Sequence, residues 1–213
     1  MYLDAFAGKN PELVSAIEAA YPLGEAGLRT PYDQLSAIVT DYIFQCPAAK
    51  WVNDTASIGI PAWRYYFNAS FANTQPYPGL GVFHSSEIPM IFGTYRYNAL
   101  NTTTQEYALS NAMQSAWARF AKNPAGGPGW NGVGTGQMGN VLVGANGTES
   151  GGLLLSSASA ILPGSFDLGL FGDRGEVPAS GVTVIDQAEV DYRCGVFEGI
   201  LDTIAGTSGQ TRA

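Results

Sequence analysis

The sequence is poor in charged residues, cysteine and histidine. Only 13% of its 213 residues are charged, 46% are hydrophobic and 12% are aromatic. Charged residues usually make up about 25% of a globular protein. A disordered chain needs high charge and few aromatic residues, so this composition excludes one. Ten Lys+Arg stand against eighteen Asp+Glu, and the net charge of −8 excludes a nucleic-acid partner held by bulk electrostatics.

Long apolar runs are also missing. The longest are short, such as residues 88–92, so we expect no transmembrane helix. The N-terminus, Met1–Asp4, has an acid where a secretory signal has a base, so we expect no signal peptide in this chain. There is no internal repeat and no linker. We therefore predict a single domain over residues 1–213, with a frayed tail at 206–213.

The composition of the polar positions favours a secreted protein. Asn, Thr and Ser fill them in place of Lys and Glu, and there are 27 glycines. The two cysteines, Cys46 and Cys194, form either one disulfide or two inert core thiols. Four N-x-[ST] sequons are glycosylation candidates, at Asn53, Asn68, Asn101 and Asn146.

Local signals place several helices. Asn10-Pro11 predicts a helix start, and Tyr21-Pro22 ends that helix. Residues 30–33 resemble a capping box, with Asp in place of Glu, before a second helix that Pro47 breaks or kinks. Residues 105–122 carry a full apolar stripe at helical spacing. A last helix is indicated by Phe197, Ile200, Leu201 and Ile204.

Strand signals are fewer. The aromatic run 63–67, bounded by proline and asparagine, predicts a strand, and shorter apolar runs predict strands at 141–143 and 182–185. Residues 73–80 must be a loop, because they hold two prolines and a glycine. Residues 151–181 are rich in Gly, Ser and Leu and show no sustained period, so no strand is predicted there.

His84 is the only histidine and follows the proline-glycine loop. A lone loop histidine is usually structural or exposed. It cannot form a zinc site without further ligands, and no cysteine or acid cluster at ligand spacing surrounds it. We therefore expect no metal and no cofactor. The remaining catalytic option is a general base for a hydroxyl nucleophile.

Residues 81–93 read Gly-Val-Phe-His-Ser-Ser-Glu-Ile-Pro-Met-Ile-Phe-Gly. This segment resembles the histidine loop of type-B carboxylesterases, the cholinesterase and fungal lipase family, which reads G-x-x-H-x-x-E-[IL]. Further resemblance covers about residues 10–150 and 181–204. It is carried by Asp41–Pro47, Trp63–Phe67, Trp117–Ala121 with Asn123-Pro124, Trp130, and Asp191–Cys194.

The resemblance implies a fold and a set of roles. The fold is α/β, the C-terminal portion of an α/β-hydrolase with the last strands of its sheet and their packing helices. His84 would be the general base of the catalytic triad, with Ser85, Ser86 and Glu87 around it in supporting positions. Cys46 and Cys194 would form the family's C-terminal disulfide. The substrate would be a small-molecule or lipid ester, and the family is secreted.

The other triad members are not found where the family has them. Its nucleophile lies on a G-E-S-x-G turn, and its order is Ser, then acid, then His, so we expect both to lie upstream of Met1. Residues 148–152, Thr-Glu-Ser-Gly-Gly, are a near match to that turn. However, Ser150 follows His84, and a glycosylated loop at Asn146 is the preferred interpretation. Asp41 matches a structural acid of the family.

One segment departs from the family pattern. Residues 152–180 stand where a short connection is expected, and they are either an insertion or translated non-coding sequence. Three hypotheses remain for the chain. It is part of an ester hydrolase and is inactive when isolated, or a non-catalytic interaction module, or a truncated product without function.

Overall fold

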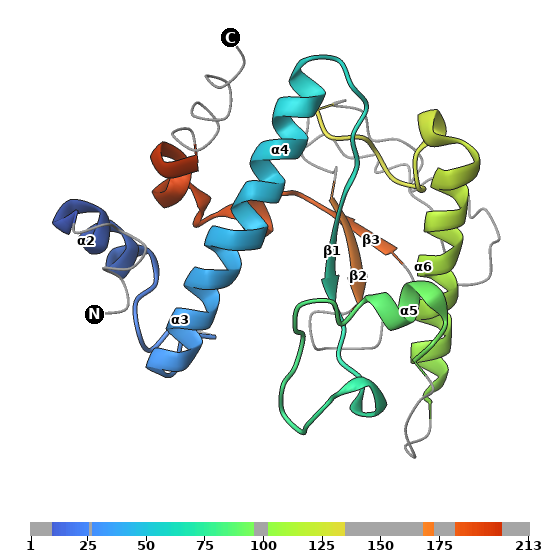
Figure 1. Cartoon of the computed structure of the whole chain (residues 1–213), viewed down its shortest axis with the longest axis horizontal. Helices are drawn as coiled ribbons and strands as arrows, with labels where there is room; N and C mark the ends of the chain where they lie inside the picture. The colour runs from blue at the N-terminus through green and yellow to red at the C-terminus, as the bar shows by residue number, and fades with distance from the viewer. Residues whose placement is uncertain (1–9, 26, 96–101, 135–167, 173–181, 202–213) are drawn as a thin grey trace, which may run out of the picture. The chain divides into compact units, whose positions relative to one another are not determined.

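A computed structural model of the chain describes residues 10–25, 27–95, 102–134, 168–172 and 182–201 (Figure 1). The chain forms two compact units. One contains Met1–Trp51 and Ala188–Ala213, and the other contains Val52–Gln187. The single domain expected over residues 1–213 stays a prediction, and the tail at 206–213 lies outside the described residues.

The first unit is helical, and its helices begin at the predicted caps. Asn10 accepts hydrogen bonds from the backbone N–H groups of Glu12 and Leu13, and α2 (Pro11–Ala20) follows. Thr30 and Asp33 form the predicted capping box of α3 (Pro31–Thr40). Each cap satisfies N–H groups that a helix start leaves without partners. Further along the chain the unit contains α7 (Ala188–Asp191), the 3-10 turn η4 (Cys194–Phe197) and helical residues 198–201.

The helix after α3 does not end at Pro47. A π-helical segment, η1 (Asp41–Gln45), leads directly into α4 (Cys46–Ser57), which contains the proline. The N–H of Cys46 bonds to the carbonyl of Asp41, five residues back. Proline lacks an N–H and disrupts the normal helical bonding, and a widened turn is one way to absorb that loss. The helix therefore does not break at Pro47, and the alternative of a kink there stays a prediction. The π-helical turn accommodates the proline.

The second unit contains a three-stranded sheet in the order β1-β2-β3. The predicted aromatic strand is β1 (Arg64–Asn68), and the strand predicted at 182–185 is β3 (Val182–Ile185). Between them lies β2 (Leu168–Gly172), parallel to β1 and antiparallel to β3. Figure 1 shows the three strands side by side, with α6 (Thr104–Lys122) running along the sheet.

The central strand β2 falls in the segment for which no strand was predicted. Its sequence, Leu-Gly-Leu-Phe-Gly, is short, and two of its five residues are glycine, which has a low strand propensity. Gly169 has a packing reason: a Cβ there would lie 2.7 Å from Cε2 of Trp130. Residues 152–167 and 173–180, and the strand predicted at 141–143, lie outside the described residues. Whether 152–180 is an insertion stays untested.

The core of the second unit lies between the sheet and two helices. The amphipathic α6 buries Leu109, Met113 and Ala116, as its apolar stripe predicts. The short α5 (Ile88–Phe92) packs against α6, and Met90 joins the same cluster. Phe171 of β2 lies in the centre of this cluster, with ring contacts to Trp117 and Trp130. The remaining elements are two 3-10 turns, η2 (Ala72–Thr74) and η3 (Pro124–Gly126).

Candidate functional site

His84 lies in a tight turn directly before α5, and its side chain is exposed. The N–H of Ser86 bonds to the carbonyl of Phe83 at 3.0 Å, and the N–H of Ile88 bonds to that of Ser85 at 3.2 Å. The buried Ser86 hydroxyl also accepts the N–H of Phe83, at 3.3 Å. The turn backbone is therefore fixed by its own hydrogen bonds, and His84 is exposed.

Ser85 has an unusual backbone conformation. Its φ is +70°, and it is the only non-glycine residue with a positive φ in the described part of the chain. A side chain in this left-handed region costs free energy, and such residues persist where the surrounding structure determines them strongly. Serine thus adopts a conformation that glycine would take more easily, immediately after the sole histidine.

A side-chain hydrogen bond closes the loop that precedes the histidine turn. The side-chain amide of Gln75 donates from Nε2 to the carbonyl of Gly81 at 2.9 Å. Gly79 and Gly81 both have positive φ, at +82° and +72°, so this chain reversal uses the freedom that glycine provides. The bond closes the proline-glycine loop three residues before His84.

The carboxylate of Glu87 faces the sheet. Its Oε1 lies 3.4 Å from the hydroxyl of Tyr65 on β1, which donates to it. Burial raises the pKa of Tyr65 to about 12, and the charge and hydrogen bond of Glu87 add to the shift. The Tyr65 ring packs edge-on against Trp117 and Phe171. A side chain from the strand therefore reaches the residue that joins the histidine turn to α5.

The helix that follows the turn is attached to α6. The buried Ser110 hydroxyl donates to the carbonyl of Met90 at 2.7 Å and accepts from Gln114 Nε2 at 2.9 Å. Nearby, the amide of Asn73 donates to the fully buried carboxylate of Glu106 at 2.8 Å. Glu106 also forms the capping box of α6 with Thr103. The histidine turn is thus continuous with a well-fixed part of the core.

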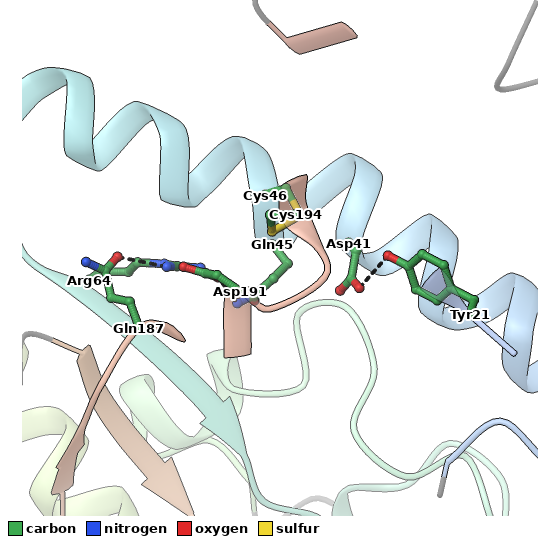
Figure 2. Close-up of a disulfide and its surroundings, with 8 residues drawn as sticks. All are labelled: Tyr21, Asp41, Gln45, Cys46, Arg64, Gln187, Asp191 and Cys194. Carbon is green, nitrogen blue, oxygen red and sulfur yellow. Dashed lines mark hydrogen bonds between the residues drawn. A yellow bond between two sulfur atoms is a disulfide. The ribbon is translucent and has the colours of Figure 1, made fainter. Parts of the chain in front are cut away.

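Several predicted residues lie elsewhere. Cys46 and Cys194 form a disulfide with a Cα–Cα distance of 5.3 Å, which confirms that pairing (Figure 2). Among the sequon asparagines, Asn53 is exposed on α4 and Asn68 ends β1, half-buried. The remaining candidates, Asn101, Asn146 and the Ser150 turn, lie outside the described residues.

The first unit has its own partly buried polar contacts, shown in Figure 2. The hydroxyl of Tyr21 donates to Oδ2 of Asp41 at 2.7 Å. Burial raises the pKa of Asp41, and Tyr21 and Arg193 partly oppose that shift. Gln45 Nε2 donates to Asp191 Oδ1 at 2.7 Å. These contacts support a structural role for Asp41. They belong to the same unit as the disulfide.

No cluster of three or more His, Cys, Asp or Glu side chains occurs among the described residues, so they hold no set of metal ligands. Within the same residues, no helix has the length and apolar character that crossing a membrane requires.

Sequence reasoning missed two side chains that contact the histidine turn and its loop. Tyr65 is separated from Glu87 by 22 positions, and no local spacing rule links them. Gln75 lies in a loop that was assigned only by its prolines and glycine. The available signal for Tyr65 was its place in an aromatic strand, where alternate residues face opposite sides of the sheet.

Comparison with known proteins identifies relatives. Residues 3–149, more than half of the chain, match the model of the Carboxylesterase family. A chlorogenic acid esterase of Aspergillus niger is 34% identical over 90 residues, 42% of this chain and 18% of that protein. Secreted lipase 5 of Gibberella zeae is 30% identical over 118 residues, 54% of this chain and 22% of that protein. The chain thus spans about a fifth of the length of these curated relatives.

A solved structure shows the same fold. A thermophilic PNB esterase superposes with a TM-score of 0.52 at 24% sequence identity, over 92% of this chain and 32% of that one. This likeness confirms the expected fold, part of an α/β-hydrolase with helices beside a small mixed sheet. The family match and the fold together show that this chain belongs to the carboxylesterase family.

Proposed function

We propose that this chain carries the general base of a carboxylic ester hydrolase, and that His84 is that base. The imidazole takes the proton of the serine nucleophile as the serine oxygen attacks the ester carbonyl. It then gives that proton to the departing alcohol, which leaves an acyl-enzyme. In the second half-reaction His84 takes a proton from water, the hydroxide attacks the acyl group, and the proton returns to the serine.

One observation carries the proposal: the sole imidazole of a carboxylesterase-family chain lies exposed on a turn whose backbone is fixed to the core. A general base must present its ring to the nucleophile in a defined direction. Exposure gives access to the ring, and the hydrogen-bonded turn supplies the direction. Glu87 contributes support rather than the triad acid, since its carboxylate faces Tyr65.

The nucleophile and the acid of this enzyme belong to a part that residues 1–213 do not contain. The isolated chain is then inactive, because one triad member alone cannot form an acyl-enzyme. Ser150 is not the replacement. The substrate is a small-molecule or lipid ester, as the names of the esterase and lipase relatives suggest. The sequons and the secreted lipase support a secreted, glycosylated protein with the Cys46–Cys194 disulfide.

A fluorophosphonate probe tests the proposal, because it labels only an activated serine. We expect no labelling of the purified chain, and no hydrolysis of p-nitrophenyl butyrate above the buffer rate. Ser150→Ala and His84→Ala variants should behave identically to the parent. Labelling that Ser150→Ala removes would show that Ser150 is a nucleophile, and the division of the triad proposed here would be wrong.

A further inference from the structure

We propose that Tyr65 is a positioning residue for His84, acting through Glu87. The Tyr65 hydroxyl holds the Glu87 carboxylate, and Glu87 joins the histidine turn to α5. The catalytic consequence of this proposal rests on the proposed function. Its structural consequence, a turn held in one conformation, does not.

The Tyr65 ring packs against aromatic rings of the core. Its ring centroid lies 4.9 Å from that of Trp117 and 6.2 Å from that of Phe171, both in edge-on geometry. The rings come from three different elements, β1, α6 and β2, and Phe171 is fully buried. Aromatic pairs of this kind stabilise the fold beyond the area that they bury. One side of the Tyr65 ring is therefore held by packing, and the residue keeps 38% of its surface exposed.

Glu87 connects the Tyr65 contact to the histidine turn through its own backbone. Its backbone carbonyl accepts the N–H groups of Met90 at 2.9 Å and Ile91 at 3.1 Å, so its main chain belongs to the first turn of α5. Its neighbour Ile88 bonds back to Ser85, the residue with the left-handed backbone. A strained residue holds its conformation only when neighbours constrain it. A tether at Glu87 supplies such a constraint two residues from Ser85.

The Tyr65 hydroxyl donates to Glu87 throughout the pH range in which an esterase works. Because the Tyr65 hydroxyl keeps its proton up to strongly alkaline pH, it donates to Glu87 and does not repel it. At 3.4 Å the contact is longer than an ordinary O–H···O bond of about 2.7–2.8 Å. Its loss should therefore produce a moderate effect of about 3–10-fold, corresponding to roughly 0.6–1.4 kcal/mol.

The chain offers a clean spectroscopic test, because His84 is its only histidine. A histidine-labelled sample gives one imidazole spin system in NMR spectra. We would compare the parent with Tyr65→Phe, Glu87→Met and the double variant, because methionine keeps the length of the side chain and removes the carboxylate acceptor. Tyr32→Phe is the control, because Tyr32 is 75% exposed. Hydrogen exchange at the Ser86 and Ile88 amides reports on the turn.

Both single variants should shift the imidazole resonances and raise amide exchange in the turn by about 3–10-fold. The double variant should exchange no faster than either single one, since both remove the same contact. Tyr32→Phe should change neither readout. Exchange within twofold of the parent in both single variants, or additive effects in the double variant, would overturn the proposal. Should Tyr65→Phe fail to fold, Glu87→Met alone decides by the same exchange criterion.

Activity separates this proposal from the proposed function. In the complete esterase, Tyr65→Phe should lower kcat about 3–10-fold and leave KM unchanged, because it misdirects the base without touching the ester. Full activity of a His84→Ala enzyme would refute the role of His84 as base, and the NMR result would still stand. A KM change without a kcat change in Tyr65→Phe would instead refute positioning, with the role of His84 intact.

Discussion

The Cys46–Cys194 disulfide should contribute a large part of the stability of this chain. It closes a loop of 148 positions, and that loop contains the whole second unit, Val52–Gln187. Loop-closure entropy for this length corresponds to about 5 kcal/mol. Cys46 is also buried among Ile17, Ile38 and Phe197, so its replacement removes packing as well.

Urea unfolding of a Cys46→Ala/Cys194→Ala variant measures this contribution. With a denaturant slope of about 2–3 kcal/mol/M, a loss of about 5 kcal/mol lowers the midpoint by roughly 2 M. The parent unfolded under reducing conditions is the control for the cross-link alone, and its midpoint should lie within about 0.5 M of the variant's. A variant midpoint within about 0.5 M of the oxidised parent would refute the loop-closure reasoning.

Three further predictions follow from particular contacts. Gly169→Ala should lower the free energy of unfolding in urea by about 1–3 kcal/mol, because its Cβ would meet the Trp130 ring. That ring cannot easily move aside, because its Nε1 donates to the Arg64 carbonyl at 2.9 Å. The control Gly195→Ala meets no atom within 4 Å, and equal effects of the two would contradict this packing. Tyr21→Phe should lower the free energy of unfolding in the same assay by about 1–3 kcal/mol, because the partly buried Asp41 carboxylate loses the Tyr21 hydroxyl as a donor. An unchanged urea midpoint would contradict this. The raised pKa of Tyr65 means that the fold binds this proton more tightly than the unfolded chain. Its stabilising contribution is complete below pH 10 and is lost as pH rises from 10 to about 12. Carbon-13 NMR of labelled tyrosine should give Tyr65 a pKa near 12 in the parent and a lower pKa in Glu87→Gln, which removes the negative charge. A Tyr65 pKa of 10 in the parent would contradict this.

Features encoded within one helical turn could be predicted from the sequence. The caps at Asn10 and Thr30 lie beside the N–H groups that they satisfy, so the residues themselves specify the helix starts. The apolar stripe of α6 likewise repeats with the period of the helix. Of the two effects predicted for Pro47, a break is wrong, because the effect of the proline depends on the turn before it, where the backbone widens from Asp41 to Gln45.

Features that depend on distant neighbours could not be predicted. The strand β2 carries two glycines, and its place in the sheet depends on β1, β3 and the ring of Trp130. The contact between Tyr65 and Glu87 joins a strand to a later turn. The left-handed backbone of Ser85 has no sequence signal, because serine rarely adopts it. The resemblance around His84 therefore indicated the candidate base but none of the contacts that fix its turn.

Ester hydrolysis by the product of the native transcript tests the central claim most directly. The cDNA would be recovered with an antisense primer in the His84 region, expressed, and compared with its His84→Ala variant on p-nitrophenyl butyrate. We predict an in-frame G-E-S-x-G turn upstream, measurable turnover, and a loss of at least about 10⁴-fold in kcat on removing His84. A His84→Ala product that keeps more than a tenth of the parent activity would contradict the account.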